Sequence, residues 1–158
     1  SCKDRVVHRK IISEFYIKFP HLRWVTFKDM RGLSEVEFGK SLQDCCLSVW
    51  IDENSSYGTY PLESMKCNIP VLGLVPNMLP TWMNEKNGFW INNKLDILDL
   101  IGDYVQNWLE DGVSDELYTE IKNTVSELPT VDTFNKNVSD LFKSYLNTRL
   151  ECLLWNIL

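Results

Sequence analysis

Residues 46–74 read CLSVWIDENSSYGTYPLESMKCNIPVLGL, and this stretch decides the fold that the sequence predicts. Leu47–Ile51 and Val71–Leu74 are apolar runs of strand-forming residues, and turn-forming residues follow the first run as far as Gly58. The segment between the two runs, Thr59–Asn68, has the length of a short helix. A strand, a crossover helix and a second strand within so few residues predict a tight parallel βαβ unit.

Gly58 lies between the first predicted strand and the predicted helix. In open parallel sheets, ligands bind in the crevice outside the carboxyl ends of the strands. Glycine lets the backbone approach a ligand closely, and the free N–H groups and positive dipole end of a helix suit a phosphate. The sequence therefore predicts a phosphate-binding site at Gly58 and Thr59, with an ordinary turn glycine as the alternative.

The sequence from Ser56 to Gly73, SYGTYPLESMKCNIPVLG, resembles the donor-binding signature of GT-B glycosyltransferases of the broad group 1, family 4-like class. That signature is roughly E-G-F-G-x-x-x-x-E-A-M-A-x-G-x-P-V. The residues that match it in register are Gly58, Leu62, Glu63, Met65, Pro70 and Val71. The first glutamate of the signature falls on Ser55, and Glu53 lies two residues upstream.

The resemblance implies a role for each matched polar position. Glu63 is expected to hold the ribose hydroxyls of a nucleotide, because a carboxylate accepts two hydrogen bonds. Gly58 and Thr59 are expected to bind the donor diphosphate. Ser55 or Glu53 is expected to contact the sugar. Without the resemblance, Glu63 would be interpreted as a solvated helix glutamate and Glu53 as a loop charge.

Arg5 and Lys10 have the spacing of the R-x-x-x-x-K pair that clamps the donor diphosphate in this class of enzyme. The resemblance implies that both are catalytic and stabilise the negative leaving group, with Arg9 as the competing register. They lie in a basic segment, residues 1–40, which carries nine Lys and Arg against five Asp and Glu. A positive rim for an anionic ligand and an ordinary solvated basic face both fit this segment.

Three further features bear on the site. Asn77–Thr81 occupies the place of the family's G-G-x-P-E turn, but Thr81 replaces the glutamate, so the resemblance does not identify the sugar. His8 and His21 have no triad-like context and are predicted to be surface or hydrogen-bonded histidines. The tryptophans and tyrosines on helices are predicted to be core residues rather than base-stacking platforms.

The composition predicts an ordinary folded domain. The chain has 158 residues, 44% of them hydrophobic and 12% aromatic, which argues against disorder. The net charge of −6 argues against general nucleic-acid binding. No apolar run has the length of a membrane span, and no signal peptide is visible.

The five cysteines have no metal-binding spacing: Cys2, Cys45, Cys46, Cys67 and Cys152. An odd number without C-x-x-C predicts reduced thiols in a cytoplasmic protein. The resemblance adds peripheral membrane contact through a missing N-terminal half as an open alternative.

Outside the central stretch, apolar periodicity and caps predict the other elements. A helix bearing Val7 and Phe15 ends before Pro20, and Leu22–Phe27 is a predicted strand. Ser34 and Glu37 have the spacing of a capping box. The remaining predicted elements are a strand at Phe89–Ile91 and helices at Lys94–Glu110, Ser114–Leu128 and Asp132–Leu154, the last with Phe134, Val138, Leu141, Tyr145 and Leu150 facing inward.

Strands that alternate with helices predict an α/β fold. We expect a Rossmann-like, doubly wound, mostly parallel sheet of about four to six strands flanked by helices. Residues 1–158 are predicted to form a single nucleotide-sugar-binding domain. The resemblance implies the C-terminal half of a GT-B enzyme, hence a fragment whose first strand is clipped ahead of Ser1.

The leading hypothesis is the donor-binding domain of a glycosyltransferase that moves a sugar from a nucleotide-diphosphate sugar to an acceptor. The resemblance implies retention of configuration, no metal, no cofactor besides the donor substrate, and little activity of this domain alone. A non-catalytic α/β interaction module and a GT-B nucleotide-sugar epimerase remain alternatives. The expected partners are the nucleotide sugar, an N-terminal acceptor domain and a second copy bound through the apolar tail, residues 150–158.

Overall fold

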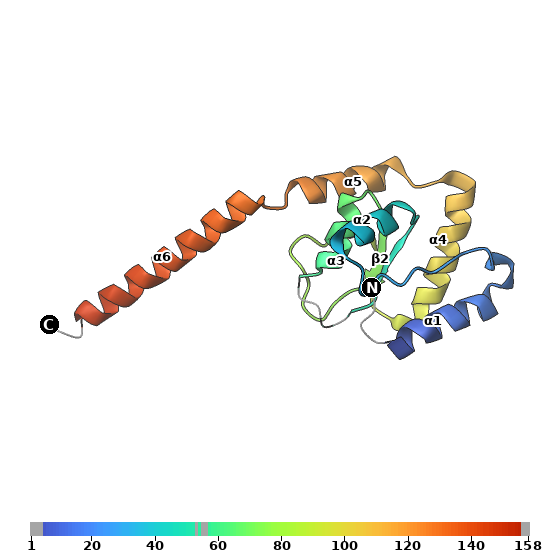
Figure 1. Cartoon of the computed structure of the whole chain (residues 1–158), viewed down its shortest axis with the longest axis horizontal. Coiled ribbons are helices and arrows are strands. Elements are labelled where there is room, and N and C mark those ends of the chain that lie inside the picture. The colour runs from blue at the N-terminus through green and yellow to red at the C-terminus, as the bar shows by residue number, and fades with distance from the viewer. Residues whose placement is uncertain (1–4, 53, 55–56, 156–158) are drawn as a thin grey trace. The chain divides into compact units, whose positions relative to one another are not determined.

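The computed structural model describes residues 5–52, 54 and 57–155, with side chains as far as residue 146. The chain forms two compact units, residues 1–126 and 127–158. The first is an α/β unit, and the second contains the helix α6 (Val131–Trp155) (Figure 1). A single helix cannot form a hydrophobic core by itself. The single domain over residues 1–158 therefore stays a prediction.

The sheet in the described part of the chain has three strands, β1 (Ser48–Trp50), β2 (Val71–Leu74) and β3 (Phe89–Ile91). Their order is β1-β2-β3 and both pairs are parallel. Helix α3 (Thr59–Lys66) connects β1 to β2. The predicted βαβ unit is therefore confirmed.

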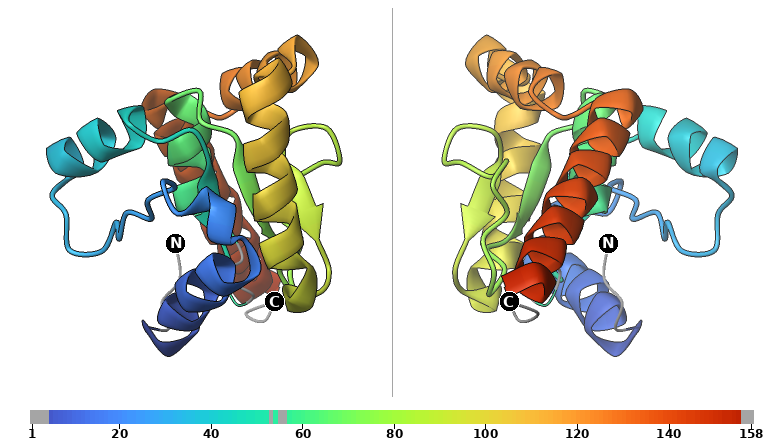
Figure 2. Two further views of the ribbon diagram at one scale, coloured as in Figure 1. Left: turned by 90° about the vertical axis from the view of Figure 1, so that its right-hand side faces the viewer. Right: turned by 90° about the vertical axis from the view of Figure 1, so that its left-hand side faces the viewer.

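Helices cover both faces of this sheet (Figure 2). Leu72 and Leu74 point to one face, where they join the buried core formed with α1 (Arg5–Lys18) and α4 (Ile97–Asp111). Side chains alternate along a strand, so Ser48 and Trp50 point to the other face, where α3 packs. Helix α5 (Asp115–Ser126) packs on α3. The structure is thus an α/β fold with a small parallel sheet.

Several helix boundaries confirm the sequence prediction. The Ser34 hydroxyl accepts from the Glu37 N–H, and the Ser34 N–H donates to the Glu37 carboxylate at 2.9 Å, so a capping box begins α2 (Glu35–Gln43). Gly112, with φ of 75°, ends α4. The Ser114 hydroxyl accepts from the Leu117 N–H at 3.2 Å and begins α5.

The predicted strand at Leu22–Phe27 is wrong. Pro20–Leu22 forms the short 3-10 helix η1, Arg23 and Trp24 form a turn, and residues 25–30 have no regular secondary structure and do not join the sheet. Two of the backbone groups are bonded elsewhere: the Val25 N–H donates to the Leu22 carbonyl at 3.0 Å, and the Tyr16 hydroxyl donates to the Val25 carbonyl at 2.6 Å. The alternation of half-buried Val25 and Phe27 with exposed neighbours is real, but no strand in the described residues pairs with it.

The predicted strand number also needs correction. The described residues form three strands instead of four to six, because the segment before α2 does not pair. β2 is the central strand, and all four of its residues are buried. β1 lies at an edge of the described sheet.

The apolar residues predicted to face inward on the last helix are not covered by other residues of their own unit. In that unit, taken by itself, Phe134, Leu141 and Tyr145 are exposed. Leu150 and the apolar tail lie outside the described side chains, so self-association through the tail stays a prediction. No helix in the described part of the chain has both the length and the apolar composition of a membrane span.

Candidate functional site

Gly58 has the position predicted for it, at the residue that precedes the first turn of α3. Its φ of 71° lies in the left-handed region that favours glycine. A Cβ added here would lie 3.1 Å from ring atoms of both Trp50 and Trp82. Backbone conformation and tight packing therefore both require glycine, whether or not a phosphate approaches its main chain.

Three tryptophans form a cluster around this position. The ring centroids of Trp50 and Trp82, and of Trp50 and Trp90, are 6.4 Å apart, and those of Trp82 and Trp90 are 5.9 Å apart. Gly73 pairs with Trp50 and Trp90 in the strand register and leaves room between their side chains. The prediction of core tryptophans concerned those on helices, and Trp108 of α4 is instead 37% exposed; the gathering of Trp50, Trp82 and Trp90 at Gly58 was not predicted. No local sequence pattern predicts this cluster, because the fold brings together residues that are far apart in the sequence.

The cluster also holds the turn that leads into α3. The Trp82 indole N–H donates to the Tyr57 carbonyl at 2.6 Å. The Trp90 indole N–H donates to the Asn84 carbonyl at 2.8 Å, in the loop after β2. Trp82 therefore positions the backbone next to Gly58, whereas Trp90 holds a different segment.

We expect Trp82→Phe to loosen the turn at Tyr57, because phenylalanine keeps most of the ring but cannot donate the hydrogen bond. The loss should cost about 1 kcal/mol and lower the Tm of the first unit by roughly 2–4 °C. Hydrogen exchange should become faster in peptides covering residues 57–60. Trp90→Phe is the matched control, and equal acceleration at residues 57–60 in both variants would contradict the positioning role.

Thr59 and Glu63 lie one turn apart on the exposed face of α3, whereas Pro61, Leu62 and Met65 are buried. Desolvation raises the pKa of Glu63 above its ordinary value; nearby Lys66 opposes this shift and Glu35 adds to it. Thr59 and Glu63 thus share one exposed surface at the start of α3, whereas Gly58 is buried against the tryptophan rings. The start of α3 offers the free N–H groups of a helix N-terminus. One turn further along, the Glu63 carboxylate can accept hydrogen bonds from hydroxyl groups.

Arg5 and Lys10 lie on a different helix, α1, which packs on the opposite face of the sheet from α3. Arg5 is exposed at the start of α1. The Lys10 ammonium is 3.6 Å from the Glu14 carboxylate, in an exposed pair one turn apart. The structure therefore brings the predicted site residues together in two groups. Glu53 and Ser55 lie outside the described residues.

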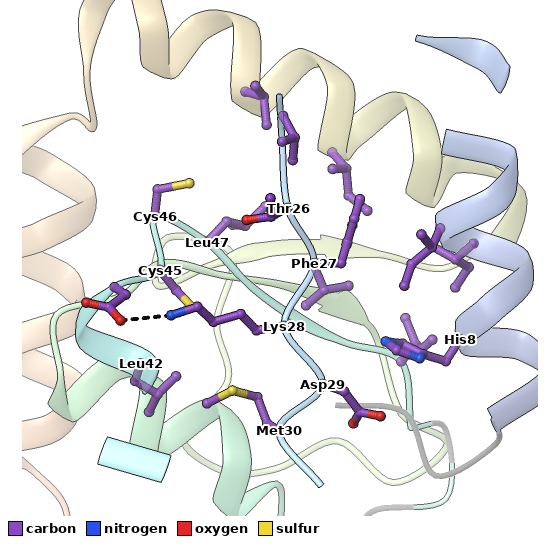
Figure 3. Close-up of a pocket in the computed structure, with 18 of the residues that line it drawn as sticks. His8, Thr26, Phe27, Lys28, Asp29, Met30, Leu42, Cys45, Cys46 and Leu47 are labelled. Atoms are coloured by element: carbon purple, nitrogen blue, oxygen red, sulfur yellow. Dashed lines mark hydrogen bonds and ion pairs between the residues drawn. The ribbon is translucent and has the colours of Figure 1, made fainter. Parts of the chain in front are cut away.

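A cavity of the first unit lies away from both groups. It has a volume of about 400 Å³ and lies beside the edge of β1 (Figure 3). Gly58, Thr59, Glu63, Arg5 and Lys10 do not line it. Thr59, Glu63, Arg5 and Lys10 are instead exposed at the surface.

Histidines and cysteines are the remaining polar candidates. His21 is exposed and shares a hydrogen bond of 3.1 Å with Gln106, which fits the predicted hydrogen-bonded histidine. His8 lines the cavity. Cys45, Cys46 and Cys67 are free thiols, and burial raises the pKa of the first two above the ordinary range. Within the described residues, no group of three or more His, Cys, Asp or Glu could hold a metal ion.

Comparison with known proteins adds no relative: no family model, no curated protein and no solved structure matches this chain.

Proposed function

We propose that the first unit binds the nucleotide-diphosphate part of a sugar donor, as the donor-binding domain of a glycosyltransferase with a doubly wound, GT-B-like fold. One observation carries the proposal: the signature-like residues fall on a parallel β1–α3–β2 unit, with Gly58 just ahead of α3. Glu63 is exposed one turn beyond the start of that helix. The motif thus has the structural context that its proposed chemistry needs.

In this proposal, main-chain N–H groups at the start of α3 bind the diphosphate, and the Glu63 carboxylate accepts hydrogen bonds from both ribose hydroxyls. Ser55 or Glu53 contacts the sugar. The bond between the anomeric carbon and the diphosphate oxygen breaks, and its electron pair leaves with the nucleoside diphosphate. The oxygen of an acceptor hydroxyl bonds to that carbon, and the hydroxyl proton passes to the leaving diphosphate. Arg5 and Lys10 offset the charge on the leaving diphosphate. Retention of configuration and independence of metal are part of the same proposal.

The two groups of residues can serve one ligand although they lie on helices of opposite faces. In doubly wound sheets, ligands bind outside the carboxyl ends of the strands, where helices of the two faces diverge. Arg5 begins α1, and Gly58 precedes α3, so both groups are close to helix N-termini. A diphosphate between two such ends is bound by main-chain donors on one side and by cationic side chains on the other.

A screen of nucleotide sugars for thermal stabilisation of the chain tests the proposal. A ligand at about 100 times its Kd stabilises the native state by about 2.7 kcal/mol, because it binds the folded chain alone. We expect at least one nucleoside-diphosphate sugar to raise the Tm, and the matching nucleoside to raise it less. If no nucleotide sugar shifts the Tm at millimolar concentration, the chain is better explained as an interaction module.

The basic pair makes a separate prediction. Arg5→Ala and Lys10→Ala should each weaken binding of a nucleoside diphosphate about two- to fivefold at low salt, since exposed ion pairs are worth roughly 0.2–1 kcal/mol. Both effects should shrink as salt is raised. Titration calorimetry at two salt concentrations measures this. Arg9→Ala is the matched control, and a larger effect there than at Arg5 would assign the diphosphate to the competing register.

A further inference from the structure

The cavity of the first unit is far larger than an ordinary packing defect. Packed protein interiors leave few spaces larger than a water molecule, whereas this cavity has a volume of about 400 Å³. Pockets that hold small molecules have volumes of roughly 300–1,000 Å³ and are lined mainly by apolar and aromatic side chains. The cavity therefore has the size of a small-molecule site.

The walls combine a buried aliphatic floor with an exposed aromatic mouth. Leu42 of α2 and Ile101 and Val105 of α4 line the cavity and are buried, so they form its floor. Trp24 and Trp108 also line it, but both are exposed, so they form its mouth. A ligand that enters the cavity thus passes from tryptophan rings to a fully apolar surface.

Aromatic side chains line the cavity from several parts of the fold. They come from the segment before α2 and from α2, α3 and α4, and they are Trp24, Phe27, Phe38, Tyr60 and Trp108. The rings of Phe38 and Tyr60 pack edge to face, with centroids 5.8 Å apart. Aromatic rings prefer offset or edge-to-face contact with other rings. A flat ring system in the cavity can therefore make such contacts with more than one wall.

The lysine, arginine and aspartate side chains at the cavity balance one another. The Lys28 ammonium lies 2.9 Å from the Asp44 carboxylate (Figure 3). The Arg31 guanidinium donates to the Asp29 carboxylate at 2.8 Å. Two cations and two carboxylates leave this rim without a net charge, so it attracts neither an anion nor a cation. Moving a charged ligand from water onto the apolar floor would be costly. The lining therefore favours an uncharged ligand.

Residues 25–30 form one wall of the cavity, and contacts at Val25 and Lys28 hold this wall. The Tyr16 hydroxyl of α1 donates to the Val25 carbonyl at 2.6 Å, and Lys28 pairs with Asp44 as described above. No hydrogen bond joins the main chain of residues 26–30 to another described residue. Segments with few hydrogen bonds open at a low cost in free energy, so this wall gives a small molecule access to the floor.

We propose that the cavity is a binding site for a small, uncharged, planar aromatic molecule of two or three fused rings. An apolar cavity of about 150 Å³ is enough for benzene, so a volume of about 400 Å³ has room for a fused ring system. The site includes neither Glu63 nor the Arg5 and Lys10 pair. The inference therefore goes beyond the proposed donor binding and does not rest on it.

The test compares three probes on the full chain. 2-Naphthol is neutral, planar and bicyclic; 2-naphthoate carries a charge on the same rings; and decahydro-2-naphthol is the saturated, non-planar form of the first. We expect calorimetric titration to show binding of 2-naphthol, and binding of the other two at least about threefold more weakly. With 2-naphthol, hydrogen exchange should slow in peptides covering residues 24–31 and 101–108, but not in residues 89–91.

Two pairs of variants locate the bound probe. Ile12 lines the cavity from a half-buried position, so Ile12→Trp fills part of it and should weaken 2-naphthol binding about tenfold or more. Ile17→Trp, at an exposed position of the same helix, is the matched control. Trp108→Ala removes a ring at the mouth and should weaken binding about two- to tenfold. Its matched control is Leu109→Ala, and because both positions are exposed, this pair keeps the test valid if Ile12→Trp does not fold.

The outcomes separate the alternatives. Absence of heat and of slower exchange with 2-naphthol at millimolar concentration would overturn the proposal, and so would equal affinity of both members in each pair of variants. If decahydro-2-naphthol binds as tightly, the site selects apolar volume, and if 2-naphthoate binds more tightly, it selects anions; either result contradicts the proposed class of ligand. Slower exchange confined to residues 57–63 would place the probe at the start of α3 instead. Donor titration is a separate measurement, so either proposal can fail without the other.

Discussion

Replacing Trp50 with alanine should destabilise the first unit by about 3–5 kcal/mol, the usual cost of removing a buried tryptophan side chain. The side chain of Trp50 is 2% exposed. Its ring contacts Trp82 and Trp90 and fills the space that Gly58 leaves open. Truncation therefore removes the contact that joins β1, the turn before α3 and the loop after β2.

Urea unfolding followed by far-UV circular dichroism measures this loss. Trp50→Phe provides a milder second variant if the alanine variant does not fold, and it should fall between wild type and alanine. Trp24→Ala is the matched control, because Trp24 is 54% exposed and its loss should change the free energy of unfolding far less. Equal losses at positions 50 and 24 would mean that the tryptophan cluster does not organise the unit.

The sequence predicted the βαβ unit because its signals are local. Apolar runs, a glycine before a helix and a proline before the second strand all lie within residues 46–74, and the parallel pairing of β1 and β2 agrees with them. The segment at Val25 carries an equally clear alternation, yet it forms no strand. Strand formation there depends on a neighbouring chain segment, and no local pattern reports whether that neighbour exists.

The candidate site likewise has one part that local sequence patterns predicted and another part that depends on long-range contacts. The positions of Gly58 and Glu63 on α3 followed from the spacing of the motif. The tryptophan rings that require a glycine at position 58 come from β1 and from the loop between β2 and β3, so only the folded structure brings them together. Arg5 and Lys10 were placed by a two-residue pattern, and their helix lies on the other face of the sheet. Whether they share a ligand with α3 is decided by long-range geometry.

The last helix illustrates a different limit. Its apolar residues recur at helical spacing, which correctly predicted a helix from the region of Asp132 onward. Periodicity reports that one face is apolar, but it does not identify what covers that face. Phe134 and Leu141 are accordingly exposed in the second unit taken by itself.

Glu63→Gln should weaken binding of a nucleotide-sugar donor about tenfold or more. If the carboxylate accepts two hydrogen bonds from ribose, each is worth roughly 1.5–3 kcal/mol, and glutamine keeps the size but loses the charge and one acceptor. The loss of one such bond corresponds to at least a tenfold change in Kd. Titrations with nucleoside, nucleoside diphosphate and nucleotide sugar should all show this weaker binding of the Glu63→Gln variant. Binding of the nucleoside alone should fall for Glu63→Gln and hardly change for Arg5→Ala or Lys10→Ala.

The raised pKa of Glu63 adds a pH signature to this prediction. Because the folded chain holds this proton more tightly than the unfolded chain, ionisation of Glu63 lowers the stability of the ligand-free chain as pH rises from the unfolded pKa through the folded one. Ribose needs the ionised form, so nucleoside binding should strengthen over the same pH interval in wild type and stay flat in Glu63→Gln. Glu110→Gln, an exposed change on α4, should behave like wild type. Equal affinity of wild type and Glu63→Gln for all three ligands at every pH would make Glu63 an ordinary solvated glutamate and remove the donor site from α3.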